Sequence, residues 1–120
     1  MPFFANKGAL IVDLNGRIAY ASTHFCDLVG VEHDKIAGMS YFDFVFPRQV
    51  QEAKKHLEAC KASTLLPFLF KLRTIKGAPV WTAIQCAPMR TASGETYAVS
   101  ATITAAKQPG NGNRKPKGRK

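Results

Sequence analysis

The sequence has few of the features that define membrane, secreted or disulfide-rich proteins. Its apolar runs fall well short of the roughly 18 residues that a membrane helix needs. The run at residues 9–12 ends at Asp13 and is too short for the apolar part of a signal peptide. The three cysteines, Cys26, Cys60 and Cys86, are widely spaced and form no C-x-x-C pair, so we expect reduced thiols that fill space in the core. These absences predict a cytoplasmic protein.

Motifs of enzymes and metal sites are also missing. The sequence has no G-x-S-x-G, no glycine-rich phosphate loop and no H-E-x-x-H. Cys86 could act as a nucleophile only with a histidine beside it, and no pattern indicates one. His24, His33 and His56 have no partners at the spacing of metal ligands. We therefore predict neither a catalytic residue nor a metal site.

Basic charge is present in excess, but it is concentrated at one end. The chain has 120 residues, enough for one domain, and a formal net charge of +9. Residues 107–120 contain six Lys and Arg and no acid, and have no large apolar side chain to bury. We expect residues 1–106 to form one mildly basic domain and residues 107–120 to form a disordered basic tail.

The first elements are predicted by turn and cap residues. Two short apolar runs, residues 9–14 and 17–21, flank Asn15-Gly16, which favours a hairpin with a type I′ turn. Ser22 is a suitable N-cap and Gly30 a suitable end for the helix between them. Residues 31–46 predict only short helical turns.

A long helix and three strands complete the predicted order. Pro47 suits the first position of a helix through about residue 63, with Val50, Ala53, Leu57 and Cys60 on one face. Residues 65–75, 80–90 and 95–105 alternate as strands do, with turns between them. This order predicts an α+β fold, in which the helices are inserted between the second and third strands of a five-stranded antiparallel sheet.

The chain resembles the PAS domain family over residues 8–106. The matching segments are LIVDLNGRIAYAS, HFCDLVG, DKIAGMSYFDFVFP and KGAPVWTAIQCAPMR, in this order and spacing. The resemblance implies that the sheet and helices form a cupped pocket. It also implies a stand-alone, non-catalytic sensory or interaction module in signal transduction or in regulation of transcription.

Neither of the cofactors known in this family is expected here. The strand PVWTAIQCAPMR is similar to the flavin-binding light-oxygen-voltage (LOV) branch, but Tyr41 stands where that branch has its reactive cysteine. Leu72, Thr82 and Thr102 stand where it has amides, and each unpaired flavin group would cost about 1–3 kcal/mol. For haem, His56 points about 80° away from the apolar face of its helix, as expected for a half-exposed surface residue.

Strand alternation and the resemblance together divide the sheet into two faces. The pocket is predicted to be lined by strand residues and closed by helical ones: Phe42, Phe46, Val50, Leu57, Phe68, Phe70, Leu72, Thr82, Ile84, Cys86, Ser100 and Thr102. This mixture suits either a small apolar ligand or a filled core without a ligand. The opposite face is predicted to expose Leu69, Trp81, Ala83, Val99, Ala101 and Ile103.

Two interactions follow as hypotheses. An exposed apolar face with a tryptophan predicts a homodimer, or docking to a signalling partner. The alternative is a nucleic-acid-associated adaptor that binds phosphates through its tail, with Arg114, Lys115, Lys117, Arg119 and Lys120 as contacts. Charge runs usually only solvate a chain, and the tail has no aromatic residue on which a base could stack.

Overall fold

The computed structural model describes residues 7–107, so the basic tail predicted at residues 107–120 lies almost wholly outside the described residues. In this range no helix has the length and apolar character needed to cross a membrane. In chain order the elements are β1 (Lys7–Val12), β2 (Ile18–Ala21), α1 (Thr23–Val29), α2 (His33–Ile36), η1 (Tyr41–Phe44), η2 (Pro47–Gln49), α3 (Val50–Ala62), β3 (Phe68–Arg73), β4 (Pro79–Arg90) and β5 (Thr96–Ala105).

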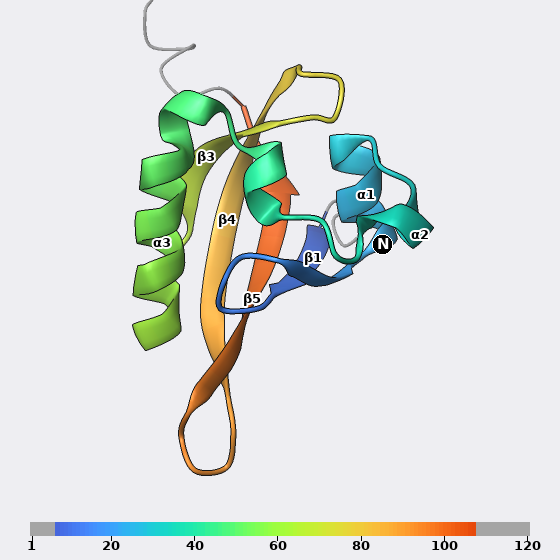
Figure 1. Cartoon of the computed structure of the whole chain (residues 1–120). Helices are drawn as coiled ribbons and strands as arrows, with labels where there is room; N and C mark the ends of the chain where they lie inside the picture. The colour runs from blue at the N-terminus through green and yellow to red at the C-terminus, as the bar shows by residue number, and fades with distance from the viewer. Residues whose placement is uncertain (1–6, 108–120) are drawn as a thin grey trace, which may run out of the picture.

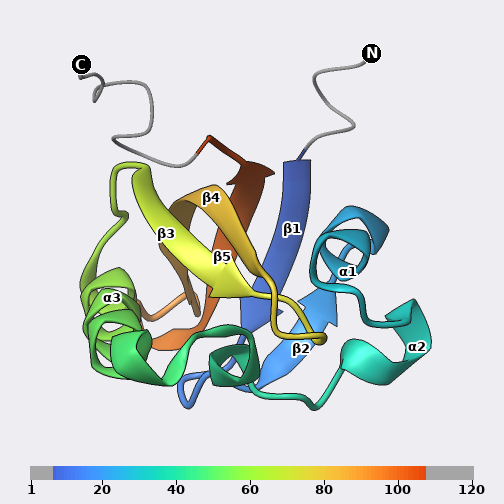
Figure 2. The same ribbon diagram turned by 90° about the horizontal axis from the view of Figure 1, so that it is seen from above.

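The five strands form one antiparallel sheet in the order β2-β1-β5-β4-β3. The first strand therefore pairs with the last, and the helices are a single insertion between β2 and β3 (Figure 1). Viewed from above, α3 lies near β3, and α1 and α2 lie near β1 and β2 (Figure 2). The α+β architecture predicted from the sequence is confirmed.

The turn of the first hairpin differs from the type I′ turn that Asn15-Gly16 predicted. Gly16 has a φ of +89°, but Asn15 does not have a positive φ. The Asp13 carboxylate accepts hydrogen bonds from the backbone N–H groups of Asn15 (2.8 Å) and Arg17 (3.0 Å), and the Asp13 carbonyl accepts one from Gly16 (3.0 Å). The side chain of Asp13 thus stabilises the turn that follows it. The loop consists of residues 14–16 and ends on Gly16 in the left-handed conformation.

Helix α1 begins and ends as its cap residues predicted. The Ser22 hydroxyl accepts a hydrogen bond from the backbone of Phe25 at the start of the helix and another from Ala9 on β1. At the other end Gly30 has a φ of +84°, a conformation that costs glycine little. The same serine thus caps the helix and fixes it to the first strand.

The long helix begins later than Pro47 predicted. Pro47 opens the short turn η2, and α3 begins only at Val50, because Gln49 (φ −111°, ψ 6°) departs from helical geometry. Within α3 only Ala53 and Cys60 are fully buried, and Leu57 is half-buried. The helix therefore rests on the sheet through a narrow stripe of small side chains.

Candidate functional site

A cavity of about 40 Å³ lies between α3 and the inner face of the sheet. Its walls come from α3, from strands β1, β3, β4 and β5, and from the turn η1. The lining residues are Leu10, Val12, Tyr41, Ala53, His56, Leu57, Cys60, Phe68, Ile84, Cys86, Val99, Ala101 and Ile103. Almost all of these side chains are apolar, so the cavity suits an apolar occupant.

Helix α3 contributes four lining residues at spacings of three and four. Ala53, His56, Leu57 and Cys60 share one face because side chains at these spacings lie above one another. The His56 ring lies 4.1 Å from the ring centre of Phe68, on β3. His56 is partly exposed, as expected, but it also packs on an aromatic ring and lines the cavity, which its angular position on the helix alone did not show.

Strand β5 faces the opposite way from the prediction. Ile103 pairs with Ile84 and Ala101 pairs with Cys86, and directly paired residues share a face of the sheet. Ile103 is 0% exposed. The inner residues are thus Val99, Ala101 and Ile103, and the outer ones are Ser100 and Thr102, the reverse of the expectation.

The physical reason for this error is the period of a strand. Alternation defines two faces but does not say which of them meets the core, and an error of one residue exchanges the whole set. Pairing with β1 and β4 decides the matter, because it aligns Val99 with Val12 and Ile103 with Ile84. Burial of the β-branched apolar side chains then follows from the hydrophobic effect.

The other predicted pocket residues are divided between the cavity and its surroundings. Leu57, Phe68, Ile84 and Cys86 line the cavity. Phe70, Leu72 and Thr82 are buried on the same face without lining it, and the Thr82 hydroxyl donates to the Phe70 carbonyl at 2.8 Å.

Of the four residues predicted to close the pocket, Leu57 lines the cavity and the other three lie away from it. Phe42 and Val50 are half-buried against the core. The prediction that Phe46 closes the pocket is wrong. Its ring lies 5.1 Å from the ammonium of Lys71, on the outward side of β3. The sequence supplied no signal for this, since Phe46 lies in an irregular segment without a period.

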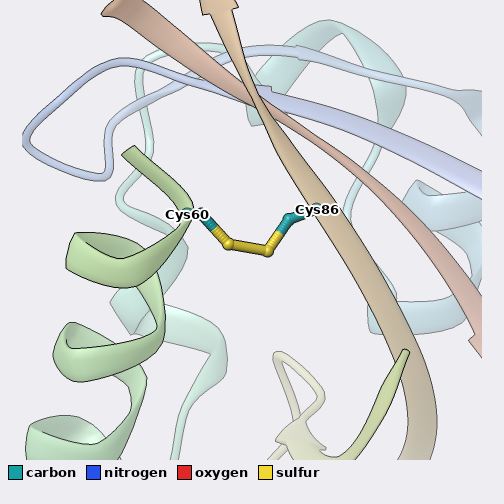
Figure 3. The surroundings of a disulfide bond; sticks show 2 residues. All are labelled: Cys60 and Cys86. Atoms are coloured by element: carbon teal, nitrogen blue, oxygen red, sulfur yellow. A yellow bond between two sulfur atoms is a disulfide. The ribbon is translucent and has the colours of Figure 1, made fainter. Parts of the chain in front are cut away.

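Cys60 and Cys86 form a disulfide across the cavity, which corrects the expectation of separate thiols (Figure 3). Their Cα atoms are 6.0 Å apart, and the bond joins the last turn of α3 to the middle of β4. Cys26 remains a buried free thiol, and its pKa is raised by burial and by the nearby Asp27 charge. A separation of 26 residues gave no sequence signal, because only packing of α3 on β4 brings the pair together.

The lining residues do not fit flavin or haem. No lining side chain is an amide, so the polar edge of a flavin would find few hydrogen-bond partners. The cavity of about 40 Å³ is also far below the roughly 300 Å³ at which sites for larger ligands begin. Tyr41 lines the cavity, and burial raises the pKa of its phenol. Within residues 7–107 no cluster of three or more metal-ligating side chains occurs.

The outer face of the sheet carries a second group of side chains, three of them apolar and one a lysine. Leu69 pairs with Ala83 and Lys71 pairs with Trp81, which places these four side chains together on the side away from α3. Leu69 is 47% exposed, and the Lys71 ammonium lies 5.9 Å from the Trp81 ring centre. We call this group of four the outer patch.

Comparison with known proteins agrees with the fold. The PAS domain family matches residues 6–104, so the chain belongs to the PAS domain family, whose members are generally sensory and signalling modules. No curated protein matches the chain.

Two solved structures show the same fold. The PAS domain of a Colwellia psychrerythraea protein superposes with a TM-score of 0.77 at 11% identity, covering 86% of this chain and 88% of that one. A light-oxygen-voltage domain studied with a flavin analogue superposes with a TM-score of 0.71 at 18% identity, covering 88% of this chain and 82% of that one.

Proposed function

We propose that this chain is a non-catalytic PAS sensory module that forms a homodimer through the outer face of its sheet. The observation that carries the proposal is that the cavity and the outer face are built on the same strands. On β4, Ile84 and Cys86 line the cavity and Ala83 lies in the outer patch. A shift of β4 caused by a change in the cavity therefore reaches the outer face directly, without an intervening element.

The outer patch has the composition of a small interface. Tryptophan is a favoured anchor in protein interfaces, and Trp81 lies beside the exposed Leu69 and the short Ala83. The same face continues over β1 with Ala9 and Ile11, which pair with outer residues of β5. An exposed apolar face of this kind is stabilised when a second copy covers it.

The cavity is the proposed site of the sensed molecule. Its walls favour a small, weakly polar compound, and a volume of about 40 Å³ admits only a few heavy atoms unless side chains move. Native mass spectrometry of freshly purified protein measures a retained small molecule and the subunit count in one experiment. We further place the module in a cytoplasmic circuit that regulates transcription, an assignment that rests on family analogy.

The dimer is tested by Trp81→Glu, which puts a charge in the middle of the outer patch. We expect the wild-type protein to sediment as a dimer at micromolar concentration and the variant as a monomer, because the tryptophan anchor is lost and the new carboxylate must be desolvated on association, even with Lys71 beside it. The matched control is Leu66→Glu, since Leu66 is 84% exposed in the loop before β3 and outside the sheet. Monomeric wild-type protein, or equal dimerisation of wild type and Trp81→Glu, would refute the proposed interface.

The second candidate is the nucleic-acid adaptor. The observation in its favour is the charge distribution, since six of the 17 basic residues lie in residues 107–120. Binding of this kind weakens steeply as salt rises. Its test is the truncation described in the Discussion.

A further inference from the structure

We propose that Cys60 and Cys86 form a reversible thiol–disulfide couple that makes the cavity responsive to peroxides and to dithiol reductants. The pair lines the cavity, joins its helical wall to its sheet wall, and is the element through which oxidation reaches both (Figure 3). The chemistry of the couple is independent of the dimer. The transmission of its state to the outer patch rests on the function proposed above.

Three hydrogen bonds hold the two cysteines close together without help from the S–S bond. The Lys61 carbonyl accepts from the Thr96 hydroxyl at 2.9 Å, and the Ala62 carbonyl accepts from the Arg90 guanidinium at 2.6 Å. On the strand side, the Leu65 N–H donates to the carbonyl of Cys86 itself, at 2.9 Å. The end of α3 therefore stays against β4 after reduction, which makes re-oxidation an intramolecular step between positioned groups.

The cavity gives small reagents access to the sulfur atoms. Holding one water needs about 10–15 Å³, and hydrogen peroxide is only slightly larger than water. A cavity of about 40 Å³ beside the pair accommodates such a molecule. Cys26 is buried elsewhere and is not a lining residue, so it is expected to remain a thiol throughout.

The proposed chemistry balances with peroxide as oxidant and a dithiol as reductant. One cysteine loses its proton, its thiolate attacks peroxide and the O–O bond breaks, which gives a sulfenic acid and a hydroxide that takes up that proton to become water. The second cysteine likewise loses its proton and its thiolate attacks the sulfenic sulfur. The S–S bond forms, the S–O bond breaks, and the leaving hydroxide takes up the proton as a second water. In reverse, a dithiol thiolate attacks the disulfide, and its second sulfur resolves the mixed disulfide to release both cysteine thiols.

The redox state alters the wall of the cavity because both sulfurs belong to that wall, and because α3 has few other anchors apart from the hydrogen bonds at its end. Its fully buried residues are Ala53 and Cys60, and His56 adds a ring contact with Phe68. Two thiols that are no longer bonded need full van der Waals separation, so reduction moves the sulfurs apart toward the adjacent cavity. Oxidation thus joins the two sulfurs, and reduction separates them while the end of α3 stays in place, which changes the space available to a ligand.

The test counts free thiols in the folded full-length protein. The protein is exposed without denaturant to hydrogen peroxide or to dithiothreitol, then unfolded, alkylated and weighed. With three cysteines in the chain, we expect one label after peroxide and three after dithiothreitol, interconvertible over repeated cycles. Three labels after peroxide show that the pair does not form, and one label after dithiothreitol shows a disulfide that is not reversible. Either result overturns the proposal.

Two variants locate the couple. Cys26→Ser is expected to take zero labels after peroxide and two after dithiothreitol, because it keeps the pair. Cys60→Ser is expected to form no disulfide in either condition and to take two labels after dithiothreitol, because Cys86 then has no partner thiol. Reduction is expected to lower the melting temperature of wild type by about 10 °C or more and to leave that of Cys60→Ser unchanged. A disulfide that forms through Cys26 would contradict the assignment.

Sedimentation of the oxidised and reduced proteins separates this inference from the proposed function. If the label counts are reversible and the protein is monomeric in both states, the thiol–disulfide couple is supported and the proposed dimer is refuted. If the protein is a dimer and its label counts do not change with redox conditions, the proposed dimer is supported and the thiol–disulfide couple is refuted.

Discussion

The two ends of the inner sheet face are packed differently. Under α1 and η1, the side chains of Phe25, Val29 and Phe44 are all 0% exposed, and the rings of Phe25 and Phe44 meet edge to face at 6.1 Å. We call these three residues and their neighbour Ala21 the solid end. Under α3, the cavity residues Ala53, Ala101 and Phe68, with the Cys60–Cys86 bond, form the cavity end.

This difference in packing shows how a small domain can combine a stable core with an internal cavity. Large aromatic and β-branched side chains at the solid end bury enough surface to hold the sheet and short helices together. The cavity end has alanines where larger residues would fill space, and it relies on a covalent link instead. Dense packing and the cavity are therefore located in different parts of one sheet.

The largest expected effect is loss of a large ring from the solid end. Phe44→Ala should lower the free energy of unfolding by about 3–5 kcal/mol, because it leaves a cavity in a packed region. Phe68→Ala is its counterpart at the cavity end, where the ring is half-buried, and should cost only about 1–2 kcal/mol. Urea denaturation measures both. Equal costs would show that the two ends are packed alike.

The second effect concerns the covalent link. Cys86→Ser should lower the free energy of unfolding by about 3 kcal/mol under oxidising conditions, because the bond closes a loop of 26 residues. Under reducing conditions the same substitution should cost much less. Urea denaturation curves with and without dithiothreitol give the comparison. If the loss of unfolding free energy is the same in both conditions, the disulfide does not contribute to stability.

Enlarging one side chain at each end should have a smaller effect on the free energy of unfolding, and the effect should differ between the two ends. Ala21 and Ala101 both pair with Leu10, on its two sides, but only Ala101 lines the cavity. Ala21→Val should cost about 1–3 kcal/mol by overpacking, whereas Ala101→Val should be neutral or stabilise by about 0.5 kcal/mol by filling space. Thermal unfolding of the two variants tests this. Destabilisation of similar size at both sites would mean that the cavity is not available.

The smallest expected effect is that of removing the tail. A chain ending at residue 106 should keep its free energy of unfolding within about 0.5 kcal/mol, because the six removed cations have no apolar surface to bury. We also expect it to retain nucleic acid in a filter-binding assay no less than the full chain does near physiological salt. A loss of retention that depends on the tail would favour the adaptor over the sensory module.

Much of the fold could be predicted because its signals are local. Ser22 and Gly30 marked the ends of α1, and the alternation of β3 placed Phe68 and Phe70 on one face. The Asn15-Gly16 pair predicted a hairpin but the wrong turn type, because the Asp13 carboxylate supplied hydrogen bonds that the dipeptide alone does not indicate.

The candidate site was harder to predict, since it depends on relations between distant segments. The faces of β5 depended on its register with β1 and β4, so Val99, Ala101 and Ile103 were placed on the wrong side. His56 entered the cavity through its packing on Phe68, which the helical period of α3 does not contain.

The amino-acid sequence by itself determined the order of elements, the helix caps and the apolar periods, because each depends on residues a few positions apart. Tertiary structure alone decided which face of β5 meets the core, that Cys60 meets Cys86, and that space remains under α3. These features depend on strand register and on the fit of side chains far apart in the chain, and neither is encoded in a local period.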